Sequence, residues 1–144
     1  MVETERVRIG ISWEHDLVFK LDFGKIKVPD LRIDETNKDE DEMVGVTPAR
    51  LLASAVAGCL SSSLLFCISK RNVQVDEFSA EAEAVIGRDQ EGRLRVLEIV
   101  VTLAPKTASP EATKRLVECK KMFEKFCTVT ESVRKGIKVT VNVA

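Results

Sequence analysis

Apolar and polar residues alternate along the first third of the chain. Apolar positions recur at every second place in residues 7–13 and again in residues 17–23, which is the period of a β-strand with one buried face. Gly24 then turns the chain into a third apolar run over residues 26–33. The pattern predicts an antiparallel three-stranded meander. One face of its first strand is formed by Val7, Ile9, Ile11 and Trp13.

A long uncharged run follows at residues 51–68. Thr47 suits the N-cap of a helix, and Pro48 suits the first helical position because its missing N–H would be unpaired there. We expect a helix over residues 48–70 that closes at residues 71–72 and is buried on several sides. A membrane span needs about twenty predominantly apolar residues. This run contains four serines and a glycine, so we expect a buried central helix and no membrane.

The second half of the chain alternates strands and helices. Residues 73–86 and 93–103 are expected to form a β-hairpin around a glycine-bounded turn. Ser109 precedes a proline and an acid, a typical helix start. A short helix is expected over residues 128–135, and the alternation at residues 137–143 predicts a final strand. The fold class is therefore α+β.

Composition indicates one soluble domain. The 144 residues are 44% hydrophobic and 31% charged, with a net charge of −1. This balance gives no general attraction to nucleic acid or anionic membranes. The opening residues do not have the pattern of a secretory signal, so none is expected. Four cysteines are too few for a disulfide-dense secreted scaffold, and we therefore expect a cytoplasmic protein. The expected organisation is a single domain over residues 1–144. It consists of a β-meander (1–34), an acidic loop (35–46) and a helix-hairpin-helix-strand part (47–144).

Candidate chemistry centres on two cysteines in unlike settings. Cys59 lies in an apolar run of small residues, where burial alone would silence it. Cys127 follows an amphipathic segment and begins the short helix, whose N–H groups would favour its thiolate. The chain has no CxxC spacing and a single histidine. This pattern favours redox chemistry by two thiols over a zinc site or a hydrolase triad. The alternative that Cys59 only packs in the core, with no chemical role, remains open. Cys67 and Cys119 are interpreted as inert buried residues.

Two segments carry a family resemblance. IDETNKDEDEMVGVTPARLLASAVAGCLSSSLLFCISKRNV resembles the first-cysteine block of the OsmC/Ohr family. ATKRLVECKKMFEKFCTVTESVRKGIKVTVNV resembles that family's second-cysteine block. The two blocks occur in the family's order, with hairpin strands between them.

The resemblance implies an OsmC-like fold in which curved antiparallel sheets pack around long central helices in an intertwined homodimer. It also implies a thiol peroxidase acting on organic hydroperoxides. Cys59 would be the peroxidatic thiol and Cys127 the resolving thiol, and a thiol or dithiol reductant would recycle the enzyme. No metal or cofactor is expected.

The chain departs from the family pattern in two places. Ala49 stands where an acid usually helps to orient an arginine beside the reactive thiol, and Thr128 replaces the usual proline. Arg50 and Arg32 are the possible activating residues. These departures indicate a divergent member. They leave two alternatives open: a non-catalytic binding module, and a general thiol redox or sensor protein with unactivated cysteines.

Overall fold

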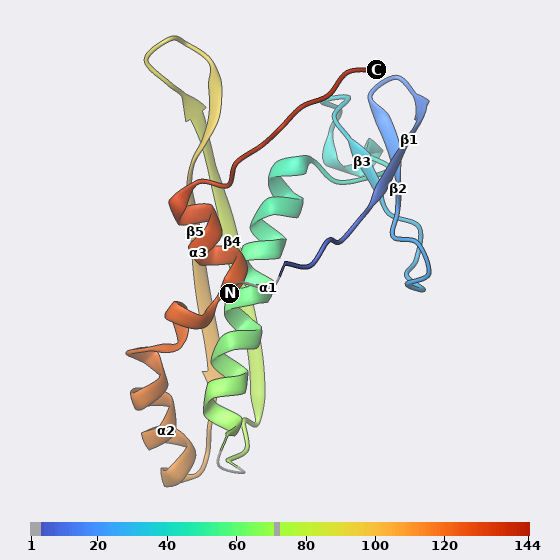
Figure 1. Ribbon diagram of the computed structural model, residues 1–144. Helices are drawn as coiled ribbons and strands as arrows, with labels where there is room; N and C mark the ends of the chain where they lie inside the picture. The colour runs from blue at the N-terminus through green and yellow to red at the C-terminus, as the bar shows by residue number, and fades with distance from the viewer. Residues whose placement is uncertain (1–3, 71–72) are drawn as a thin grey trace. The chain divides into compact units, whose positions relative to one another are not determined.

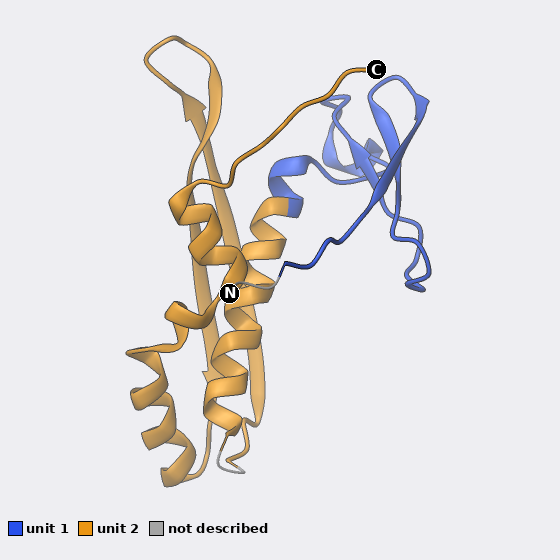
Figure 2. Ribbon diagram, viewed as in Figure 1, with its two compact units in different colours: residues 1–51 blue, residues 52–144 orange. Residues whose placement is uncertain are grey.

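The computed structural model describes residues 4–70 and 73–144, and Figure 1 shows its helices and strands. The chain divides into two compact units, Met1–Leu51 and Leu52–Ala144, which are coloured separately in Figure 2. The α+β class predicted from the sequence is confirmed. The predicted helix end at residues 71–72 lies outside the described residues.

The first unit contains the antiparallel meander β1 (Gly10–His15), β2 (Val18–Asp22) and β3 (Arg32–Asp34). The meander is confirmed, but its outer strands are shorter than predicted. β3 begins only at Arg32, after Pro29, which has no N–H to donate to a strand ladder. The apolar face expected of the first strand is exposed, with Trp13 69% accessible.

Asp34 organises the acidic loop that precedes the long helix. Its buried carboxylate accepts hydrogen bonds from the Thr36 hydroxyl (2.6 Å), the Thr36 N–H (2.9 Å) and the Val44 N–H (3.1 Å). These three donors, the Thr36 hydroxyl foremost, lower the pKa of Asp34. Gly45 is needed beside them because a Cβ there would collide with the Arg32 carbonyl. The loop is therefore fixed at both ends by specific contacts.

The long helix α1 (Pro48–Ser69) starts as predicted, with the Thr47 hydroxyl accepting from the Arg50 N–H at 3.3 Å. The prediction that this helix is buried on several sides is wrong for the single chain. The helix buries one face, and Phe66 is 68% exposed. That face recurs at three- and four-residue steps and consists of Ala53, Val56, Leu60, Leu64, Cys67 and Ile68. Helix α1 is long and apolar enough to cross a membrane, but a single helix of this kind is weak evidence for a membrane span, because core helices of soluble proteins have the same length and composition. Its buried face belongs to the core of the second unit.

The second unit also contains the hairpin of β4 (Glu77–Arg88) and β5 (Leu94–Lys106), as predicted. Helix α2 (Pro110–Lys120) begins at Ser109, whose hydroxyl accepts from the Ala112 N–H at 3.0 Å. A 3₁₀ turn, η2 (Phe123–Phe126), leads into α3 (Thr128–Lys135).

The predicted last strand is not formed. Residues 137–144 belong to no strand, and the alternating residues Ile137, Val139, Val141 and Val143 are 62–91% exposed. An alternating segment becomes a strand only when a sheet edge pairs with its backbone. The hairpin and meander pair with no such segment in the described chain.

Candidate thiol site

Two elements of the second unit bring Cys59 and Cys127 together. Cys59 lies in the middle of α1, and Cys127 lies at the junction of η2 and α3. Their sulfur atoms are 2.8 Å apart although 68 residues separate them in the chain. A disulfide bond is about 2.05 Å long, so the two cysteines are free thiols in direct contact.

The backbone on both sides fixes Cys127. Its N–H donates to the Glu124 carbonyl at 3.1 Å, which closes η2, and its carbonyl accepts from the Glu131 N–H at 3.0 Å in the first turn of α3. The residue is 1% exposed. Its sulfur also contacts the hydroxyl of the buried Thr130 at 2.9 Å. The start of a short helix after Cys127 is confirmed, whereas a 3₁₀ turn, not the second helix, precedes this residue.

Hydrogen bonding lowers the pKa of Cys127 against the effect of its burial. Burial is the largest single influence and raises the pKa of this thiol, but four donors together outweigh it. The donors to the thiolate are the Cys59 S–H, the Thr130 hydroxyl and backbone N–H, and the Ser63 hydroxyl. Hydrogen bonding therefore favours the thiolate form of Cys127.

An apolar groove of about 620 Å³ lies beside the thiols. Thr130 lines this groove and contacts Cys127, so it connects the groove to the sulfur pair. Arg134 is a cationic lining residue, and its guanidinium is paired with Glu124 (2.5 Å) and Glu131 (2.6 Å). The apolar lining comes from α1, β5, η2 and α3 and includes Leu52, Val56, Leu60, Val96, Leu97, Ile99, Val101, Leu103, Phe123 and Val133.

The two arginines proposed from the sequence lie in the first unit and have carboxylate partners there. Arg32 pairs with Glu14 at 2.5 Å, and Arg50 pairs with Glu40 at 2.6 Å. The Arg50 guanidinium also donates to the Thr47 hydroxyl at 3.5 Å. Both side chains are therefore engaged with oxygen acceptors. An activating role at Cys59 remains a prediction for each.

Sequence reasoning missed the second cysteine pair. Cys67 and Cys119 are buried, as predicted, but a disulfide between α1 and α2 joins them, so the interpretation of each as an unbonded cysteine is wrong. A signal was present in the spacing. Cys67 lies eight residues after Cys59, and Cys119 lies eight residues before Cys127. Two segments that pack in opposite directions would bring these residues together in two pairs.

The described residues, 4–70 and 73–144, contain no group of three or more His, Cys, Asp or Glu side chains placed to hold a metal ion. His15 is the exposed last residue of β1, and its ring contacts the Asp16 carboxylate at 3.3 Å.

Comparisons with known proteins agree with this fold. The family model described as OsmC-like protein matches residues 37–142. No curated protein matches the sequence.

Solved structures give the same result. An OsmC-like protein of unknown function from Vibrio cholerae has a TM-score of 0.69 at 13% identity, covering 90% of this chain and 94% of that one. An OsmC-like protein from Mycoplasma pneumoniae has a TM-score of 0.68 at 15% identity, covering 99% and 98%. The organic hydroperoxide resistance protein OhrB of Bacillus subtilis has a TM-score of 0.60 at 20% identity, covering 90% and 91%. At these identities the likeness concerns the fold, and the family match covers most of the chain, so the chain belongs to the OsmC-like protein family.

Proposed function

We propose that this protein reduces organic hydroperoxides at the expense of thiols, as a defence against oxidative stress. The observation that carries the proposal is the 2.8 Å contact between the Cys59 and Cys127 sulfurs. Family membership supports it, since a similar solved structure is an organic hydroperoxide resistance protein. The proposed site consists of Cys59 and Cys127, with no bound cofactor.

In the proposed reaction the Cys59 thiolate attacks the terminal oxygen of the hydroperoxide. The O–O bond breaks, the alkoxide takes a proton and leaves as the alcohol, and Cys59 becomes a sulfenic acid. The Cys127 thiolate then attacks the Cys59 sulfur, and the hydroxyl leaves as water when it takes a proton. The resulting disulfide is reduced by an external thiol or dithiol, which is itself oxidised.

The geometry suits the resolving step. Closing the 2.8 Å contact to a disulfide length of about 2.05 Å requires an approach of only about 0.8 Å. The lowered pKa of Cys127 raises the fraction of thiolate available for this attack. The apolar groove beside the pair would receive the organic part of the peroxide.

A second candidate is general thiol–disulfide chemistry in which Cys127 is the attacking sulfur. The lowered pKa favours it, because this shift falls on Cys127. In that case the roles of the two cysteines are exchanged and peroxide selectivity is not required. A third possibility, a non-catalytic module that binds an apolar ligand in the groove, needs neither thiol to react.

We also propose that the protein acts as a cytoplasmic homodimer. The exposed apolar residues of the C-terminal segment 137–144 support this, since an alternating segment gains stability by pairing with a sheet edge. The exposed apolar side of α1, which includes Phe66, is a second surface that a partner copy would cover.

Stopped-flow oxidation by cumene hydroperoxide and by H₂O₂ tests the function. It would be run on the native chain, on Cys59→Ser and on Cys127→Ser. Ser62→Ala is a matched control, because Ser62 lies on α1 and its exposed hydroxyl donates to the Gly58 carbonyl of the same helix. We expect faster reaction of the native chain and the control with the organic peroxide, no reaction of Cys59→Ser, and sulfenic acid accumulation in Cys127→Ser.

Two other outcomes contradict the proposal. Sulfenic acid on Cys127 in the Cys59→Ser variant, with an inert Cys127→Ser variant, would exchange the roles in favour of the second candidate. Equal and slow oxidation of all four proteins would support the binding module.

A further inference from the structure

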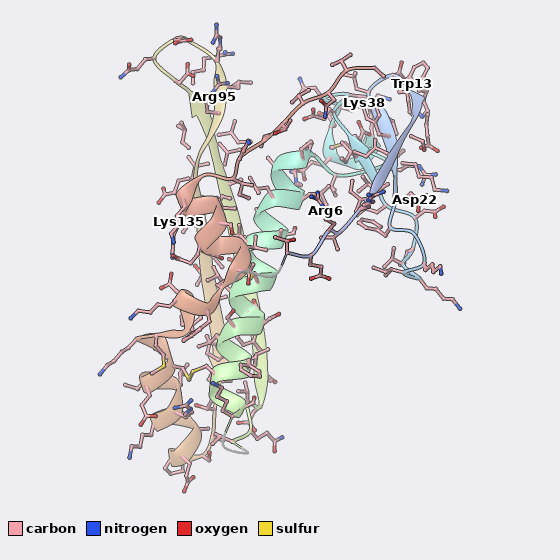
Figure 3. All side chains as sticks on the ribbon, in the orientation of Figure 1. Arg6, Trp13, Asp22, Lys38, Arg95 and Lys135 are labelled. Atoms are coloured by element: carbon pink, nitrogen blue, oxygen red, sulfur yellow. A yellow bond between two sulfur atoms is a disulfide. The ribbon has the colours of Figure 1, made fainter. Side chains whose placement is uncertain are left out.

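The disulfide between Cys67 and Cys119 has an arginine beside it. Figure 3 shows the bonded sulfur atoms in yellow between α1 and α2. The Arg115 guanidinium donates from Nε to the Cys67 carbonyl at 3.1 Å and from Nη2 to the Cys67 sulfur at 3.7 Å. Because the planar guanidinium donates two hydrogen bonds to Cys67, it is held as a fixed cationic partner of the Cys67 sulfur.

The setting of Arg115 strengthens this interaction. Its side chain is 13% exposed, and Glu118 on the same helix contacts Nη1 at 3.1 Å. In such a partly buried site a charge interacts more strongly with its neighbours than it would in water. The contacts with Glu118 and the Cys67 carbonyl fix the orientation of the guanidinium toward the sulfur.

The two sulfurs of the disulfide are not equivalent. Cys67 is 8% exposed and has the arginine contact, whereas Cys119 is 0% exposed. A cavity of about 260 Å³ is lined by Arg115 together with Val73, Glu111, Lys114 and Glu118. Arg115 therefore both lines this cavity and contacts the Cys67 sulfur, and an incoming thiolate would reach the less buried Cys67 before Cys119.

We propose that Cys67 and Cys119 form a second thiol–disulfide centre, separate from the Cys59–Cys127 pair, whose substrate is a dithiol reductant. One thiolate of the dithiol attacks the Cys67 sulfur, and Cys119 leaves and takes a proton. The second thiolate of the dithiol then attacks the reductant sulfur of the mixed disulfide, and Cys67 leaves as a thiolate beside Arg115. The protein gains two electrons, and the dithiol becomes a disulfide.

This assignment gives Cys67 both roles that exchange requires. It is the less buried of the two residues, attacked in the first step, and the arginine-stabilised leaving group in the second. In reverse, the Cys67 thiolate is the nucleophile that attacks an external disulfide. A purely structural crosslink would need neither the arginine nor this asymmetry.

The test uses the full chain and its Cys59→Ser/Cys127→Ser double variant, with dithiothreitol as the dithiol. After reduction, iodoacetamide labelling at pH 7 is read peptide by peptide for Cys67 and Cys119. We expect the folded double variant to be reduced without denaturant and Cys67 to label at least about tenfold faster than Cys119. Since the double variant lacks the first pair, this result does not depend on the proposed peroxide reduction.

Charge variants separate a redox role from a structural one. Arg115→Gln should slow Cys67 labelling by about tenfold, and Arg115→Lys should restore part of the loss because it keeps the positive charge. Glu118→Gln should speed Cys67 labelling, because it removes the negative charge that competes for the guanidinium. Arg93→Gln, an exposed arginine of the hairpin turn paired with Glu91, is the control and should change nothing.

The proposal is overturned by a disulfide that dithiothreitol opens only in denaturant, or by equal labelling of the two cysteines. It is also overturned if Arg115→Gln and Glu118→Gln shift the labelling rate in the same direction. If Arg115→Gln does not fold, as judged by circular dichroism, the Arg115→Lys and Glu118→Gln rates still decide between the two roles.

Discussion

The Thr130 hydroxyl is expected to control the reactivity of Cys127. Its oxygen is 2.9 Å from the Cys127 sulfur, and both side chains are buried. Thr130→Val keeps the shape of the side chain and removes the hydroxyl, while the Thr130 backbone N–H stays in place. The thiolate then loses one of its donors, and the pKa of Cys127 should rise.

The size of the effect follows from the type of contact. A hydrogen bond to a charged group contributes about 1.5–3 kcal/mol. The loss of such a bond corresponds to a rise in pKa of about one to two units. At a pH below the pKa, each unit lowers the thiolate fraction about tenfold. At pH values below the native pKa of Cys127, Thr130→Val should therefore slow its thiolate reactions by about ten- to a hundredfold. Thr130→Ser, which keeps a hydroxyl, should remain close to the native rate.

Iodoacetamide labelling between pH 5 and pH 10, read on the Cys127 peptide, measures this directly. Cys67 and Cys119 remain bonded without added reductant and do not label. The expected result is a labelling curve displaced to higher pH in Thr130→Val only. Coincident curves for the native protein and Thr130→Val would refute the assignment of Thr130 as a thiolate donor.

Three further predictions concern the fold and its assembly. Asp34→Asn should destabilise the first unit at neutral pH. Because the pKa of Asp34 is lowered by folding, its carboxylate stabilises the folded state fully above the unfolded pKa of about 4, and this stabilisation is lost as the pH falls through the lower folded pKa. The urea midpoints of the native protein and the variant should therefore differ at pH 7 and converge in acid. Unchanged midpoints at pH 7 would contradict the role of Asp34. Leu64→Ala removes a 2% exposed side chain from the core and should cost about 2–5 kcal/mol in urea unfolding; a loss below about 1 kcal/mol would place Leu64 outside a packed core. Light scattering after size exclusion should give twice the 16.0 kDa chain mass, and a monomer at all concentrations would exclude the proposed dimer.

The sequence predicted the elements that depend on local signals. Thr47 and Ser109 mark their helix starts through side-chain hydroxyls, and both are observed to accept backbone N–H groups. The hairpin turn and the short helix after Cys127 follow from local chemistry in the same way.

Features that depend on non-local pairing were predicted less well. Residues 137–143 have the alternation of a strand but lack a paired edge in the described chain. The long helix is uniformly apolar, so periodicity could not indicate which side is buried. The Cys67–Cys119 bond and the contact of Arg115 with Cys67 join residues 52 and 48 positions apart. Such contacts are set by helix packing, and only the equal eight-residue cysteine spacings hinted at them.

The central claim is that Cys59 and Cys127 act as one redox pair. The most direct measurement is disulfide mapping by mass spectrometry after the protein reacts with one equivalent of cumene hydroperoxide. We predict a new peptide pair linked through Cys59 and Cys127, with the Cys67–Cys119 linkage already present before the reaction. Oxidation that ends as sulfinic acid on one cysteine, with the other still a free thiol, would contradict the account.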